Sequence, residues 1–153
     1  MDEKAQTRAQ ILEAAGIRFR HYGYQKTTMS EIASDLSMST GNLYRFYPSK
    51  LDIAEAHAHF HEADEDRLME EIVARKDPAL LRLRAFSSMV LEETFRIIDE
   101  SKKVFELAQA ISRERPSYAN RRLAQERVYL KSMMRDGIED GSLEPCLNLE
   151  FTA

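Results

Sequence analysis

Two short helical patterns separated by a tight break, between Thr28 and Lys50, constrain this chain more than any other stretch. Thr28 is followed three residues later by Glu31, a capping box in which each side chain bonds a backbone N–H that the first helical turn leaves unpaired. A helix is therefore predicted to begin at Met29. Ser39 predicts the start of a second short helix, because serine is a preferred N-cap residue. The segment should fold as a helix, a turn and a helix.

The apolar residues of this segment are spaced to face inward. Ile32, Ala33 and Leu36 form a narrow stripe on the first helix, and Leu43 and Tyr47 form one on the second. A helix over residues 3–22 is predicted to close the same small core with Ile11, Leu12, Ala15, Phe19 and Tyr22. The three helices together predict a compact N-terminal unit.

The outward face of the second helix carries hydrogen-bonding side chains, one glycine and no acidic residue. Its residues are Thr40, Gly41, Asn42, Tyr44 and Arg45. Glycine costs a helix about 1 kcal/mol relative to alanine, so Gly41 indicates that something approaches the backbone closely. The major groove of DNA fits both features.

The run from Ile11 to Lys50 resembles the N-terminal DNA-binding domain of the TetR family of transcriptional repressors. The matching residues are Tyr22-Gly23-Tyr24, Thr27-Thr28, Ile32-Ala33, Ser39, Gly41, Leu43-Tyr44 and Pro48-Ser49-Lys50. The sequence departs from the family pattern at two places. Ser37 stands where the family usually has a glycine in the turn, so a non-glycine residue must adopt the turn conformation. Phe46 and Tyr47 reverse the usual order, which removes the polar aromatic from position 46.

The resemblance implies a DNA-binding set and two partners. The set is Thr28, Ser39, Thr40, Gly41, Asn42, Tyr44, Arg45 and Lys50. Arginine can form two hydrogen bonds with guanine, and asparagine can form two with adenine. Hydroxyl and ammonium groups can bind phosphate oxygens. The resemblance also implies a homodimer that binds a palindromic double-stranded DNA operator and is released by a small-molecule effector. The alternative is a helical sensing or interaction module without DNA binding, which Phe46 and a weak positive charge favour.

Charge is divided unevenly along the 153 residues, whose formal net charge is −4. Residues 1–50 hold seven Lys or Arg and five Asp or Glu, whereas residues 51–153 hold fifteen and twenty-one. A basic head suits contact with phosphates, and an acidic body disfavours non-specific contact. No apolar run approaches the ~18 residues of a membrane span, so a cytoplasmic protein without a membrane partner is expected. The single Cys146 excludes an internal disulfide and a cysteine-based zinc cage.

The apolar spacing of the rest of the chain predicts helices, and no alternating stretch of β-branched residues appears. The predicted fold class is therefore all-α. Helices are predicted over about 50–76, 78–100, 101–111 and 116–138. The expected domains are residues 1–48, which bind DNA, and residues 49–153, which bind the ligand and dimerise. Family members usually continue with two more helices that pair with a second subunit, so truncation is the expectation here. Apolar contacts are predicted from Phe60 and Leu68, and core contacts from Leu80, Phe86 and Phe95, while the last helix runs through Leu123 and Val128.

Two further groups of residues have a functional and an ordinary interpretation. His57, His61 and Asp64 lie on one side of a helix and are weak candidates for a metal site, although polar helix faces often hold histidines. Ser87, Ser88, Thr94, Tyr118 and Tyr129 are weak candidates for an effector pocket, although they could simply face solvent. No cofactor is predicted. An enzyme is not expected, because Cys146 has no histidine near it in sequence and there is no phosphate-binding glycine loop.

Overall fold

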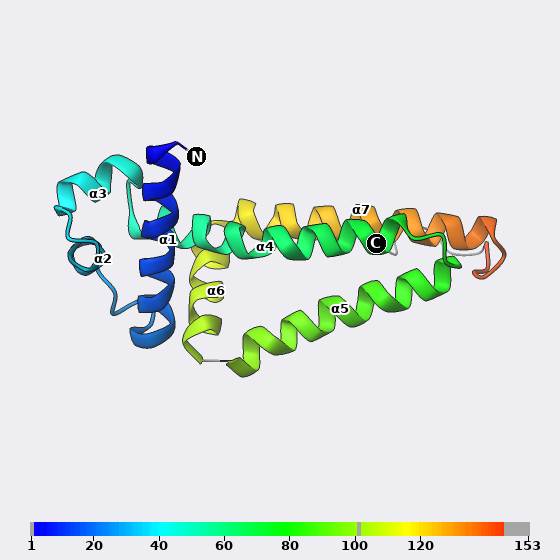
Figure 1. Ribbon diagram of the computed structural model, residues 1–153. Helices are drawn as coiled ribbons and strands as arrows, with labels where there is room; N and C mark the ends of the chain where they lie inside the picture. Colours follow the sequence, from blue (N-terminus) through cyan, green and yellow to red (C-terminus); the bar gives the residue numbers. More distant parts are fainter. Residues whose placement is uncertain (1, 101, 146–153) are drawn as a thin grey trace. The chain divides into compact units, whose positions relative to one another are not determined.

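The computed structural model describes residues 2–100 and 102–145, the side chains of residues 97–100 excepted. Over these ranges the chain is helical and contains no strand, as predicted (Figure 1). Its helices are α1 (Glu3–Tyr22), α2 (Met29–Asp35), α3 (Thr40–Phe46), α4 (Lys50–Ala74), α5 (Ala79–Glu100), α6 (Lys102–Glu114) and α7 (Pro116–Glu139). Cys146 lies outside the described residues. No helix within them is both long and apolar enough to cross a bilayer.

The chain divides into two compact units. The first unit contains Met1–Glu62 and Ile97–Arg115, and the second contains Ala63–Arg96 and Pro116–Ala153. The division therefore falls inside α4 and α5, whereas the sequence placed the boundary after residue 48. We call α1, α2 and α3 together the head. The first turns of α4 belong to the same unit as the head. The separation of DNA binding from ligand binding at residue 48 stays a prediction.

Side-chain caps start α2, α3 and α4 where the sequence placed them. Both bonds of the Thr28–Glu31 capping box are present at α2. The Ser39 hydroxyl accepts the Asn42 N–H at 3.1 Å and starts α3. Ser49 accepts the Asp52 N–H at 3.2 Å and starts α4. Because each cap satisfies backbone groups that would otherwise be unpaired, these starts follow from local sequence.

The head closes over a small apolar core drawn from its three helices. Fully buried residues are Ile11, Ala15, Phe19, Ile32, Ala33 and Leu43. The inward placement of Tyr22 is wrong, because its side chain is 52% exposed. Gly23 follows it with φ +91° and turns the chain, so that Tyr24 is buried instead. The Tyr24 ring centroid lies 5.6 Å from that of Phe19.

Ser37 occupies the turn between α2 and α3 with φ +52°, the conformation that the sequence required of a non-glycine residue. Replacing Ser37 with glycine is expected to raise the free energy of unfolding by about 0.5–1 kcal/mol, because relief of left-handed strain exceeds the added entropy of the unfolded chain. Urea unfolding measures the change. Ser34→Gly, at an exposed position inside α2, is the control and should lower stability. A lower midpoint for Ser37→Gly would contradict the strain.

The second unit has its own core, formed by Met69 and Ile72 of α4, Phe86 of α5 and Met133 of α7. Arg82 joins these helices from a buried position. Its guanidinium donates to the Val73 and Asp77 carbonyls and to the Asp136 carboxylate, at 2.8, 3.1 and 2.7 Å. The prediction for Phe86 is confirmed. The predicted contacts are wrong for Phe60, Leu68, Leu80 and Phe95, which this chain leaves exposed, and Leu123 and Val128 of α7 are exposed as well. Their helices carry apolar residues on more than one face, and only one face packs inward.

Candidate nucleic-acid interface

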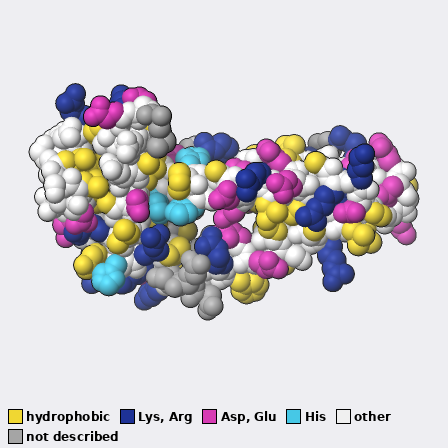
Figure 2. Space-filling model, viewed as in Figure 1, with side chains coloured by type: hydrophobic (Ala, Val, Ile, Leu, Met, Phe, Trp, Pro, Cys, Tyr) yellow, Lys and Arg dark blue, Asp and Glu magenta, His cyan; other side chains and the backbone are white. Residues whose placement is uncertain are grey.

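The outer face of α3 brings the predicted recognition residues together. Leu43 anchors the helix from its buried side. Gly41, Tyr44 and Arg45 are exposed, and Thr40 and Asn42 are half-buried. Figure 2 shows the end of the head around α3 mostly in white, the colour of uncharged polar side chains and backbone. This face offers hydrogen-bond donors and acceptors without an acidic residue to repel phosphates.

Gly41 is not required by the fold. An added Cβ would meet nothing within 4 Å, and the backbone does not have the positive φ that favours glycine. Alanine would therefore fit and would improve helix propensity by about 1 kcal/mol. The fold therefore supplies no reason for a glycine here, and the close approach of DNA to Gly41 stays a prediction.

Two of the residues predicted to contact DNA, Thr28 and Ser39, already serve as helix caps. The Thr28 hydroxyl donates to Glu31 Oε2 at 2.7 Å, and these Thr28 hydrogen bonds lower the pKa of the Glu31 carboxyl. The Ser39 oxygen accepts the Asn42 N–H, which still allows its hydroxyl proton to be donated to a phosphate. Both residues sit at the N-terminal end of a helix, where the backbone dipole favours an anion. Their DNA contacts stay predictions.

Lys50 has a partner that the sequence did not reveal. Its ammonium donates to the Tyr24 and Thr27 carbonyls at 2.6 and 2.8 Å and lies 4.3 Å from the centre of the Tyr24 ring. Burial lowers its pKa. These bonds attach the loop between α1 and α2 to the start of α4. A phosphate contact from Lys50 stays a prediction, and it would have to compete with these carbonyls.

The weak metal candidates do not form a site. Within the described part of the chain, no three His, Cys, Asp or Glu side chains are grouped so as to hold a metal ion. His57 and His61 have ring centroids 4.5 Å apart, but His57 is only 8% exposed and packs edge-on against Phe19. The structure gives His57 a packing role.

Acid is expected to destabilise the first unit through His57. Burial, with the nearby charges of His61 and Arg20, lowers its pKa from 6.5 to about 4. The unfolded chain therefore binds this proton more readily, so stability is lost as pH falls from about 6.5 to about 4, by about 2 kcal/mol. Urea unfolding across this range measures the loss. His57→Asn should flatten it, and His59→Asn, at an exposed position, should not. Equal pH dependence in all three proteins would exclude His57.

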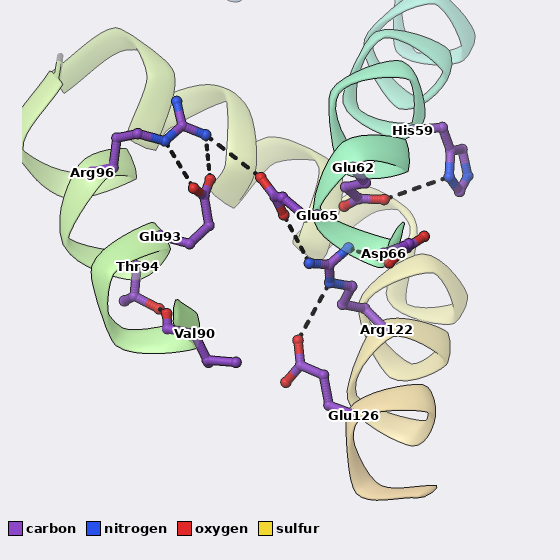
Figure 3. Close-up of polar contacts among 10 residues, drawn as sticks. All are labelled: His59, Glu62, Glu65, Asp66, Val90, Glu93, Thr94, Arg96, Arg122 and Glu126. Carbon is purple, nitrogen blue, oxygen red and sulfur yellow. Dashed lines mark hydrogen bonds and ion pairs between the residues drawn. The ribbon is translucent and has the colours of Figure 1, made fainter. Parts of the chain in front are cut away.

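The five effector-pocket candidates are not brought together. Ser87 and Ser88 are exposed on α5, and the exposed Thr94 hydroxyl donates to the Val90 carbonyl at 2.8 Å (Figure 3). Tyr118 lies under the Arg121 guanidinium. Tyr129 packs against Phe86 and its hydroxyl lies 3.4 Å from Glu70. Their role in binding an effector stays a prediction.

An all-helical chain whose first three helices present a capped helix-turn-helix with an acid-free outer face belongs to the class of DNA-binding regulators. The family described as "Bacterial regulatory proteins, tetR family" matches residues 11–57. The HTH-type transcriptional regulator YhgD of Bacillus subtilis is 30% identical over 151 residues, which cover 94% of this chain and 74% of that protein. The chain belongs to the TetR family of transcriptional regulators, whose members are not enzymes.

More distant relatives share the fold. The fatty acid metabolism regulator protein of Bacillus subtilis is 24% identical over 99% of this chain and 78% of its own length. The crystal structure of FadR from Bacillus subtilis, in complex with stearoyl-CoA, has a TM-score of 0.69 at 22% identity and covers 93% of this chain and 76% of that one. The crystal structure of FadR from Thermus thermophilus, in complex with lauroyl-CoA, has a TM-score of 0.62 at 23% identity. The match covers 94% of this chain and 73% of that one.

Proposed function

We propose that this protein is a repressor that binds a near-palindromic operator as a homodimer and is released by a small-molecule effector. The observation that carries the proposal is the outer face of α3, where an exposed glycine without a structural role stands among hydrogen-bonding side chains. Family membership supports DNA binding in general. The cytoplasm, where operators lie, is the expected location.

Each side chain on this face has a role that its chemistry suits. Arg45 and Asn42 read base edges, because guanidinium and amide groups form paired bonds to guanine and adenine. Thr40, Tyr44 and Ser39 donate to phosphates and fix the register. Two copies related by a two-fold axis insert α3 into successive major grooves, so the half-sites lie at least one DNA turn apart.

A fatty-acyl thioester is the first effector class to test. Support comes from the two FadR structures, which hold stearoyl-CoA and lauroyl-CoA. The exposed Leu91 and Phe95 of α5 also offer apolar surface to an acyl chain. An effector can shift the DNA-binding equilibrium only by the difference between its affinities for the two states.

Selection of bound sequences from random duplex DNA tests the proposal. We expect a near-palindrome, and we expect its affinity in a mobility-shift assay to fall steeply with salt, because phosphate contacts release counterions. Arg45→Ala should relax base preference at one position in each half-site. An acyl-CoA, added at constant salt, should release the duplex, with free coenzyme A as the control. Failure to enrich any sequence would contradict DNA binding, whereas enrichment without release would contradict only the effector class.

A further inference from the structure

Arg115 links the end of α6 to the first turns of α4. Its Nη2 lies 2.8 Å from Asp52 Oδ1, and its Nε lies 3.1 Å from Glu55 Oε2. All three residues belong to the first unit, in which α6 ends beside the start of α4 (Figure 1). Charge-assisted hydrogen bonds from one planar guanidinium fix direction as well as distance. Arg115 therefore holds the start of α4 in a defined orientation.

Asp52 binds Arg115 while it also completes the cap of α4. Its other carboxylate oxygen accepts the Ser49 hydroxyl at 2.7 Å, and its backbone N–H donates to the Ser49 oxygen at 3.2 Å. Glu55 lies three residues further along the same side of the helix, so the two carboxylates would repel each other without a cation between them. Arg115 therefore stabilises the arrangement in which Asp52 caps α4.

The first turn of α4 contacts both elements that are predicted to meet DNA. Lys50, its first residue, donates to the carbonyls of Tyr24 and Thr27 in the loop that leads to α2. The chain passes from α3 to the Ser49 cap through Tyr47, whose side chain is buried. A change in the orientation of this turn would therefore shift the loop before α2 and the end of α3 together.

We propose that Arg115 is a positioning residue for operator binding, which fixes the first turn of α4 and thereby the placement of α2 and α3 against DNA. The inference rests on the proposed function. Arg115 acts through Asp52 and Glu55 and needs no contact with the duplex, because its guanidinium is bonded to both carboxylates. Its side chain is 38% exposed, and an ion pair at such a position adds little to global stability. We therefore expect its effect in operator affinity rather than in unfolding.

A mobility-shift assay of the full chain on the selected operator tests this role. Arg115→Met keeps a long side chain without its charge, and we expect it to bind about tenfold more weakly than the parent. Arg113→Met is the matched control, because it removes the same charge from an exposed position near the same end of α6, where Arg113 pairs with the adjacent Glu114. Its affinity should equal that of the parent. Arg115→Lys, which lacks the planar guanidinium, should bind with intermediate affinity. Equal affinities for Arg115→Met and Arg113→Met would overturn the proposal.

A double-mutant cycle on operator affinity shows whether Arg115 acts through Asp52. Asp52→Asn keeps an oxygen that can accept the Ser49 hydroxyl, but it removes the charge that pairs with Arg115. In the Asp52→Asn background, Arg115→Met should therefore weaken binding by only about threefold or less, so that the two losses do not multiply. Losses that multiply would show that the arginine acts by another route, and the proposed positioning would be wrong.

Amide hydrogen exchange supplies a readout without DNA. The N–H groups of Asp52 and Ile53 donate to the hydroxyl and carbonyl oxygens of Ser49 at 3.2 and 3.3 Å. Both should exchange about tenfold faster in Arg115→Met and at the parent's rate in Arg113→Met. Unchanged exchange in Arg115→Met would exclude the positioning of α4 by this residue. If the parent bound no selected duplex, the proposed function would fail, whereas the exchange rates would still decide whether Arg115 positions α4.

Discussion

Gly16→Ala is expected to lower the free energy of unfolding of the first unit by about 3 kcal/mol. The added Cβ would lie 2.3 Å from Cε1 and 2.9 Å from Nε2 of His57. The ring cannot withdraw easily, because it is buried and packs edge-on against Phe19. The absence of a side chain at Gly16 is what allows α1 and α4 to approach each other here.

Urea unfolding of a double-mutant cycle measures this contact. His57→Ala removes the obstacle, so the double variant should be more stable than the sum of the single changes predicts, by about 1–3 kcal/mol. Gly41→Ala is the matched control, since it makes the same substitution in a helix with open space around it and should not destabilise. Additive effects of Gly16→Ala and His57→Ala would show that the two residues do not limit the approach of the helices.

The helix boundaries were predictable because their signals are local. The Thr28 box, the Ser39 and Ser49 caps and the prolines at 48, 78 and 116 act within one turn of the residues that they start or stop. The positive φ of Ser37 was predicted from the family resemblance instead, because the family usually has a glycine at this position of the turn. No knowledge of tertiary contacts was needed for these features.

The contacts that assemble the units were not predictable in the same way. Gly16 and His57, or Lys50 and the Tyr24 carbonyl, are distant in sequence, and no spacing rule connects them. Periodicity identified Phe95 and Val128 as apolar members of a helix face, but it could not show which face the chain covers. Likewise, the charges of Glu65, Glu93 and Arg122 were visible in the sequence, whereas their convergence depends on how three helices pack.

The outer face of α3 was predictable, because one short helix supplies all of it. Sequence and structure together distinguish two helical glycines. Gly16 is needed because another side chain of the protein fills its space, whereas Gly41 has open space around it. The fold does not need a glycine at position 41, at the exposed start of α3. A substitution there should therefore change DNA binding without changing folding.

Gly41→Leu is accordingly expected to weaken operator binding by about 100-fold, or about 2.7 kcal/mol, while the free energy of unfolding changes by less than about 1 kcal/mol. The new side chain projects from the first turn of α3 into the space that we assign to the DNA backbone and bases. Gly41→Ala should give a smaller loss of affinity and a small gain in stability. Mobility shift on the selected operator and urea unfolding measure the two effects separately.

Ala124→Leu provides the matched control, because it places the same side chain at an exposed position of α7 in the second unit. Its operator affinity should equal that of the parent. If Gly41→Leu bound the operator as tightly as Ala124→Leu, α3 could not enter the groove with its first turn, and the assignment of Thr40, Asn42 and Arg45 to the duplex would fail with it. A graded loss from glycine to alanine to leucine, without loss of stability, is the result that steric contact with DNA requires.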